Sequence, residues 1–126
     1  MANAVITTAA RKKLLQARAG DIILPKITGM AFGNGGMDGA GEVVEASDSQ
    51  TGLRSEIFRK PVDGHEFLND TTCRYSCTLE NTELVGEFIS EIALYDADGD
   101  LVAVKNFRSK GKDSDIEMVF YIDDMF

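Results

Sequence analysis

The chain has 126 residues, of which 44% are hydrophobic, and a formal net charge of −8. That length suits one domain spanning residues 1–126 with a sizeable core, and no apolar run approaches the roughly 20 residues of a membrane-spanning helix. Two cysteines make no disulfide framework and no secretory signal is evident, so we expect an intracellular protein. The acidic balance argues against nucleic-acid binding, which depends on neutralising phosphates.

The first predicted element is a helix over about residues 8–19. Thr7 or Thr8 suits the N-cap, the following residues are mostly good helix formers, and Gly20 suits the position after the helix. Its apolar stripe is narrow and rich in alanine, so it buries little by itself. Together with Lys26, and against Asp21 alone, its basic residues give residues 1–28 a local charge of +4 on an otherwise acidic chain. The basic residues of the helix are Arg11, Lys12, Lys13 and Arg18. This basic helix has three alternative interpretations. It binds a neighbouring subunit, it is a solvated face or, with the weakest support, it lies on a membrane surface.

Residues 26–32 predict a strand with Pro25 at its entrance. A glycine-rich loop follows, from Gly33 to Gly41. A dinucleotide-type GxGxxG pattern beginning at Gly33 fails because Asp38 occupies its sixth position, and no Gly-Lys-Ser/Thr follows to make a P-loop. We therefore expect an exposed loop that is flexible or ordered by a partner.

The middle of the chain predicts one clear strand. Residues 51–60 fit either a short helix or a strand, which Pro61 ends, and residues 62–70 read as a loop carrying a solvated His65. Residues 71–80 alternate as a half-buried strand does, with four side chains on one face: Cys73, Tyr75, Cys77 and Leu79. Four residues of strand separate two Cα atoms by about 13 Å. A disulfide spans at most about 7 Å, so both thiols should be free and buried.

The strongest local signal is a hairpin over Phe88–Phe107, turning at Asp96-Ala97-Asp98-Gly99-Asp100. We predict a three-residue loop, residues 97–99, with Gly99 left-handed. That register sets Leu94 opposite Val102, Ile92 opposite Val104 and Glu91 opposite Lys105. A two-residue loop would place Ile92 beside Lys105, a poorer match.

A last strand closes the predicted fold, with alternate apolar residues on one face: Ile116, Met118, Phe120 and Ile122. The fold class is then α+β, with an N-terminal helix and a mainly antiparallel sheet or sandwich of five or six strands. The β-rich body spans about residues 26–123.

Candidate chemistry is limited to the three aspartates of the hairpin turn, Asp96, Asp98 and Asp100. Clustered carboxylates beside a glycine suit calcium, but an EF-hand loop would need Gly where Leu101 stands and Glu where Phe107 stands. Aspartates are also favoured in turns that bind no metal. No serine or cysteine has a base suitably placed, so we predict no catalytic residue, no cofactor and no metal.

Four segments in order resemble one protein family: ITTAARKKLLQA, ITGMAFGNGG, TGLRSEIFRK and EIALYDADGDLVAVKNF. From about Ile6 to Phe126 the chain resembles the N-terminal, tail-attaching domain of bacteriophage tail-collar fibre proteins, prophage relatives included. The resemblance implies a structural, non-enzymatic virion component where fibres join the baseplate, made in the host cytoplasm. It implies other tail and baseplate proteins as partners and homo-oligomers in the particle, with no nucleic acid and no membrane insertion.

Family members often continue into a shaft and a receptor-binding tip, so this chain is either a short baseplate protein or the attachment part of a fibre. We expect two surfaces to carry assembly, because each would be completed by a neighbour: the helix, through Arg11, Lys12, Lys13 and Arg18, and the loop, through Asn34, Gly35 and Gly36. Arg11, Lys12 and Lys13 should all point outward. The alternative function is a small calcium- or ligand-binding β module that uses the Asp96–Asp100 turn.

Overall fold

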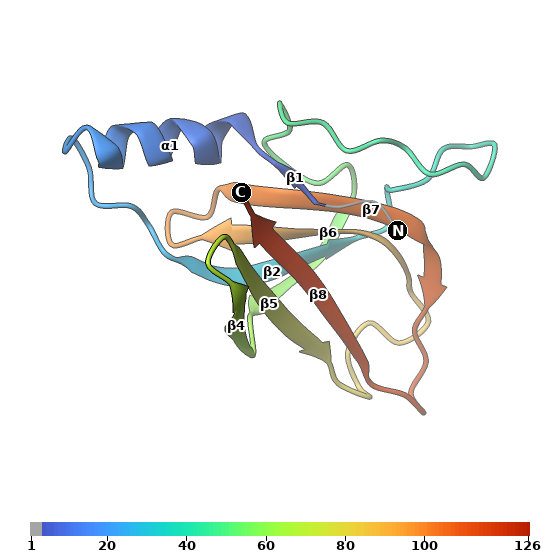
Figure 1. The fold of residues 1–126 in the computed structure, drawn as a ribbon. Coiled ribbons are helices and arrows are strands. Elements are labelled where there is room, and N and C mark those ends of the chain that lie inside the picture. Colours follow the sequence, from blue (N-terminus) through green and yellow to red (C-terminus); the bar gives the residue numbers. More distant parts are fainter. Residues whose placement is uncertain (1–3) are drawn as a thin grey trace.

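A computed structural model describes residues 4–126 as one helix and eight strands in two antiparallel sheets (Figure 1). The α+β class is therefore confirmed. The elements are β1 (Val5–Ile6), α1 (Thr8–Arg18), β2 (Ile27–Gly33), β3 (Glu56–Pro61), β4 (Gly64–Asn69), β5 (Thr72–Leu79), β6 (Phe88–Asp96), β7 (Leu101–Gly111) and β8 (Met118–Met125).

The larger sheet has the order β1-β7-β6-β2-β3 and the smaller sheet the order β4-β5-β8. Two of these strands were not predicted. β1 has only two residues, and it pairs with β7 through Val5 opposite Val104. β4 lies where a loop was predicted, so the loop assignment of His65 is wrong. His65 is exposed on an edge strand, where its ring contacts Tyr75 at a centroid distance of 5.5 Å.

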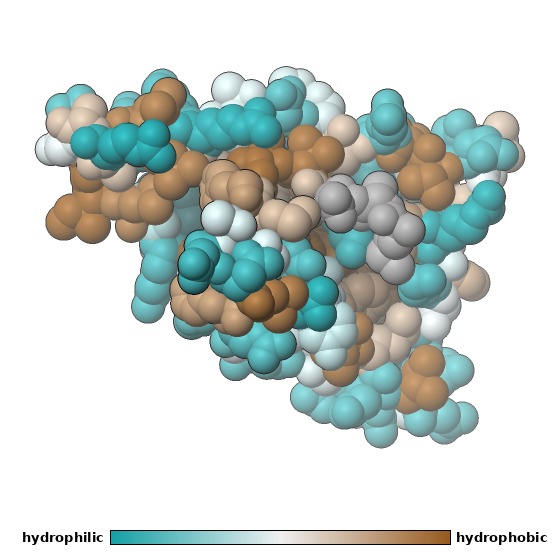
Figure 2. Space-filling view, viewed as in Figure 1, coloured by the Kyte–Doolittle hydropathy of each residue, from teal (hydrophilic) through white to brown (hydrophobic). Residues whose placement is uncertain are grey.

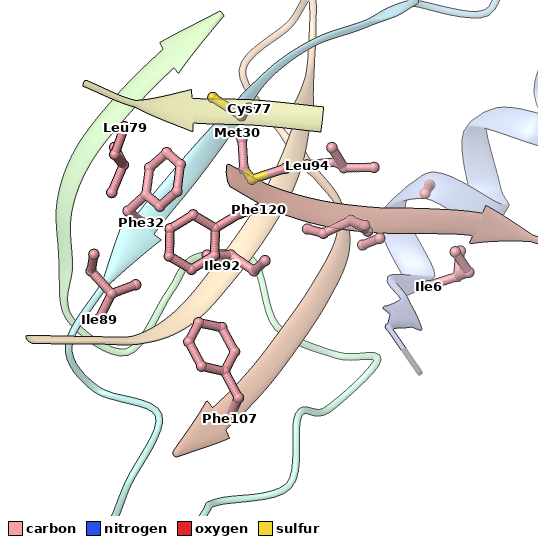
Figure 3. Packing of buried hydrophobic residues seen from close by; sticks show 13 residues of the cluster. Ile6, Met30, Phe32, Cys77, Leu79, Ile89, Ile92, Leu94, Phe107 and Phe120 are labelled. Atoms are coloured by element: carbon pink, nitrogen blue, oxygen red, sulfur yellow. The ribbon is translucent and has the colours of Figure 1, made fainter. Parts of the chain in front are cut away.

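The core fills the space between the two sheets (Figure 3). Phe32 of β2 meets Phe120 of β8 edge to face, with ring centroids 5.3 Å apart, and Phe107 of β7 lies 6.0 Å from Phe120. Because these rings come from both sheets, their burial holds the two layers together. Ile116 is 43% exposed and precedes β8, so its predicted place on the buried face is wrong.

The predicted alternation of β5 is confirmed at its two cysteines. Cys73 and Cys77 are both buried and both free. Burial raises the pKa of the Cys77 thiol to about 12, so this group is a neutral thiol at ordinary pH. The segment that was ambiguous between helix and strand is the strand β3, and it ends at Pro61 as expected.

The predicted helix is confirmed to within one residue at its C-terminus. Thr7 is the N-cap, and its Oγ1 accepts a 3.1 Å hydrogen bond from the Ala10 amide. Gly20 follows the helix with a φ of +86°. Only Ala10 is buried along α1, which agrees with the narrow stripe read from the sequence.

The hairpin turn is confirmed, but the predicted register of its strands is wrong by one residue. The amide of Gly99 donates to the Asp96 carbonyl and its φ is +86°, as a three-residue loop requires. The pairing then shifts between Leu94 and Tyr95, so that Leu94 faces Ala103, Ile92 faces Lys105 and Glu91 faces Asn106.

A bulge at Val102 explains the shift. The Val102 carbonyl accepts a hydrogen bond from the Thr7 amide, and the Thr7 hydroxyl donates to the Leu101 carbonyl. Contacts with the chain's first residues therefore shape β7 at this point. A register argument from two strands alone could not include them.

Replacing Gly99 by valine should lower the free energy of unfolding by about 1–2 kcal/mol, because a β-branched residue resists a positive φ. The matched change Asp98→Asn should cost less than about 0.5 kcal/mol, because Asn serves the same turn position and the side chain is exposed. Urea unfolding of both variants measures the difference. Equal losses would contradict this account of the turn.

Candidate assembly surface

Lys13 links α1 to the tip of the β6–β7 hairpin. Its Nζ donates to Oδ2 of Asp96 at 2.7 Å, of Asp98 at 3.1 Å and of Asp100 at 2.7 Å. The Lys13 side chain is only 15% exposed. Burial alone would lower the pKa of the Lys13 ammonium, but the hydrogen bonds to the three carboxylates outweigh it and hold the pKa above its ordinary value.

This contact changes two interpretations of the sequence. The expectation that Lys13 points outward is wrong, because its charge faces the protein itself. The carboxylate oxygens of Asp96, Asp98 and Asp100 do lie within 4.8 Å of one another, as metal ligands could. However, the Lys13 ammonium already supplies the positive charge that this cluster requires, so the geometry gives no support to the calcium alternative.

The other basic residues of α1 are exposed, as was predicted for the first two: Arg11, Lys12 and Arg18. Arg11 makes a 3.5 Å ion pair with Asp48, and both side chains are more than half exposed, so this pair contributes little to stability. Three of the four predicted helix positions are therefore available to a partner.

Exposed apolar side chains continue this surface beyond the helix. Ile23 is 94% exposed, Leu15 is 63% exposed and Leu24 is 45% exposed. Figure 2 shows a hydrophobic patch at the end of α1, over the segment that follows the helix. We call α1 together with residues 19–25 the helix platform.

A hollow of about 220 Å³ lies beneath the helix platform, and its lining includes Leu14, Leu24, Pro25 and Phe126. Asp124 also lines it. Within residues 4–126 the Oδ1 atom of Asp124 is buried without a hydrogen-bond partner, and burial raises the pKa of this carboxyl group. The helix platform is thus incompletely packed on its inner side as well.

The first part of the glycine-rich loop is ordered by one buried side chain, Glu91 of β6. Glu91 is 0% exposed. Its Oε2 accepts from the amides of Gly35 at 2.7 Å and Ser55 at 2.8 Å, and its Oε1 accepts from the Arg54 amide at 2.8 Å. The carboxylate therefore joins two loops to the central hairpin.

The neighbouring glycine is held in the same way. The Gly36 amide donates to Ser90 Oγ at 2.9 Å, and a Cβ at Gly36 would collide with the Ser90 carbonyl. Asn34 is exposed, Gly35 is half-buried and Gly36 is buried. The expectation that this loop needs a partner is thus wrong for residues 33–36, whereas residues 38–41 are exposed. A glutamate within an apolar strand was the available signal, but the incorrect register paired it with Lys105.

Comparison of the sequence with known protein families identifies the family of this chain. Residues 1–119 match the phage tail-collar fibre protein family, N-terminal region. The chain belongs to this family. No curated protein and no solved structure matches it.

Membership makes this tail-collar fibre protein a structural component of a phage tail, associated with other tail proteins. None of the helices described in residues 4–126 is long and apolar enough to cross a membrane.

Proposed function

We propose that this domain attaches a tail fibre to the baseplate by protein–protein assembly, and that the helix platform makes the contact. The observation that carries the proposal is the 94% exposure of Ile23 within a group of exposed apolar side chains. Scattered exposed apolar residues are normal, but contiguous ones mark binding surfaces. Ile23 lies beside Leu24 in sequence, and both adjoin the exposed end of α1.

Charge supports the same surface. Arg11, Lys12 and Arg18 are exposed on a chain whose net charge is −8, so the helix platform differs in sign from the rest of the protein. A partner with an acidic rim around an apolar depression fits it. The apolar side chains would supply most of the binding energy, and the basic residues would orient the partner and speed its association.

The test uses two variants of the helix platform that leave the internal contact of Lys13 intact. The first is Ile23→Ser with Leu15→Ser, and the second is Arg11→Ser, Lys12→Ser and Arg18→Ser. Val43→Ser is a matched control, since Val43 is 39% exposed and lies elsewhere. Incorporation into tail particles should fall about tenfold or more for the apolar variant.

The charge variant should lose incorporation mainly at low salt, because screening weakens the same contacts in the parent. Circular dichroism and thermal melting establish that all variants are folded. Incorporation of both variants at the parental level, at low and at high salt, would show that the helix platform is only a solvated face.

A further inference from the structure

The core reaches the surface at a gap between the two sheets. A groove of about 170 Å³ lies between β7 and β8, and Ile92 forms part of its lining. The other lining residues are Lys105, Phe107 and Lys110 of β7 and Met118, Val119, Phe120 and Tyr121 of β8. We call this groove the seam. β8 is an edge strand of the smaller sheet, so its outer edge faces away from β5 and is open to another strand.

The seam is basic as well as apolar. Residues 105–110 contain Lys105, Arg108 and Lys110 and no acidic residue. The ammonium of Lys110 lies 6.0 Å from the centroid of the Phe107 ring, so a positive charge stands directly over the apolar lining. An extended segment with acidic and aromatic side chains has the complementary chemistry.

The opposite edge of the smaller sheet has that chemistry. All of β4 after Gly64 is exposed, and Phe67 and Leu68 are 73% and 43% exposed. Residues 62–73 contain Asp63, Glu66 and Asp70 and no lysine or arginine. An exposed, apolar edge strand of this kind is a template for pairing with another chain unless something covers it.

We propose that β4 of one copy of this chain pairs along the seam of a second copy, so that the smaller sheet continues from β8 of one subunit into β4 of the next. Backbone hydrogen bonds would join the two edges. Phe67 would cover the apolar lining. Glu66, which points to the other face of β4, and Asp70, which lies beyond the end of the strand, would bring acidic groups close to the basic residues of the seam. The inference rests on the proposed role in assembly and names a second copy of the chain as one partner.

Each copy would use two different surfaces in this contact, so the contact is heterologous. Repetition of a heterologous contact gives a closed ring or an open filament, whereas a two-fold dimer would need one self-complementary patch. Both edges belong to the same three-stranded sheet, so the sheet would extend through the assembly without a new fold element.

Charge reversal provides the test on the purified full chain. The seam variant is Lys105→Glu with Lys110→Glu, and the edge variant is Glu66→Lys with Asp70→Lys. In either variant alone, like charges would face one another, and the dissociation constant for self-association should rise about 100-fold. In an equimolar mixture every contact between unlike variants is complementary. The affinity between the two variants, as measured by sedimentation, should therefore return to within about threefold of the parent's affinity for itself.

A parent chain that is monomeric at about 0.5 mM would overturn the proposal, as would a mixture that associates no better than the separate variants. A further variant, Phe67→Ser, should also dissociate the assembly, while the control Val43→Ser should not.

The experiment also separates this proposal from the attachment function. If the seam and edge variants self-associate like the parent but helix-platform variants still lose particle incorporation, the proposed pairing at the seam is wrong and the attachment function stands. An acidic segment of another tail protein on the seam would appear as lost particle incorporation without any change in self-association, which also overturns the pairing of copies.

Discussion

Replacing Lys13 by methionine should lower the free energy of unfolding by about 2–3 kcal/mol. Methionine keeps the apolar stem and removes the ammonium that faces three carboxylates. Breaking a fully buried ion pair costs about 3–5 kcal/mol, because a charge is left without compensation. Here Asp96 is 3% exposed, but Asp98 and Asp100 are 59% and 57% exposed, so water relieves part of the repulsion and the loss is smaller.

The matched control for this change is Arg11→Met, two residues earlier on α1. Its exposed pair with Asp48 should contribute about 0–1 kcal/mol. Chemical denaturation measures both losses, and a double-mutant cycle with Asp96→Asn isolates the coupling of Lys13 to its most buried partner. Equal losses for Lys13→Met and Arg11→Met would contradict the link between α1 and the hairpin tip.

Replacing Glu91 by alanine should be the more damaging change, with a loss of about 3–5 kcal/mol. The carboxylate accepts from three backbone amides, of Gly35, Arg54 and Ser55, and hydrogen bonds to a charged group contribute about 1.5–3 kcal/mol each before the loops relax. After the substitution these amides would have to reach water by opening both loops, so part of the loss is recovered.

Two further variants make this prediction specific. Glu91→Gln keeps the shape but turns an amide nitrogen toward amide donors, so it should still lose about 2 kcal/mol. Glu117→Ala changes an exposed glutamate and should lose less than about 0.5 kcal/mol. Hydrogen exchange should accelerate at Gly35, Arg54 and Ser55 in the Glu91 variants. Unchanged exchange at those amides would show that another group orders the loops.

Local chemistry was sufficient to predict α1, β5 and the hairpin turn. A capping threonine, a period-two alternation and an Asp-Gly pair each act within a few residues. β1 and the bulge at Val102 depend on contacts between residues far apart in the sequence, such as the pairing of Val5 with Val104. No window along the sequence contains that information.

The candidate surface was predicted less well, for the same reason. Arg11, Lys12, Lys13 and Arg18 look alike in the sequence, but only Lys13 reaches the hairpin tip. Gly35 and Gly36 suggested a loop without internal support, whereas Glu91 and Ser90 supply that support from more than fifty residues away. The chemistry of each side chain could be read from the sequence, but its partner depended on the tertiary fold.

The pairing of β1 with β7 also orders events during protein synthesis. The hydroxyl of Thr7 donates to the Leu101 carbonyl, 94 positions later, so the N-terminal segment leaves the ribosome long before its binding site exists. Until β7 is made, the helix platform has no surface on which to dock. β1 and α1 are therefore fixed late, and the helix platform reaches its final geometry only when most of the domain has been made.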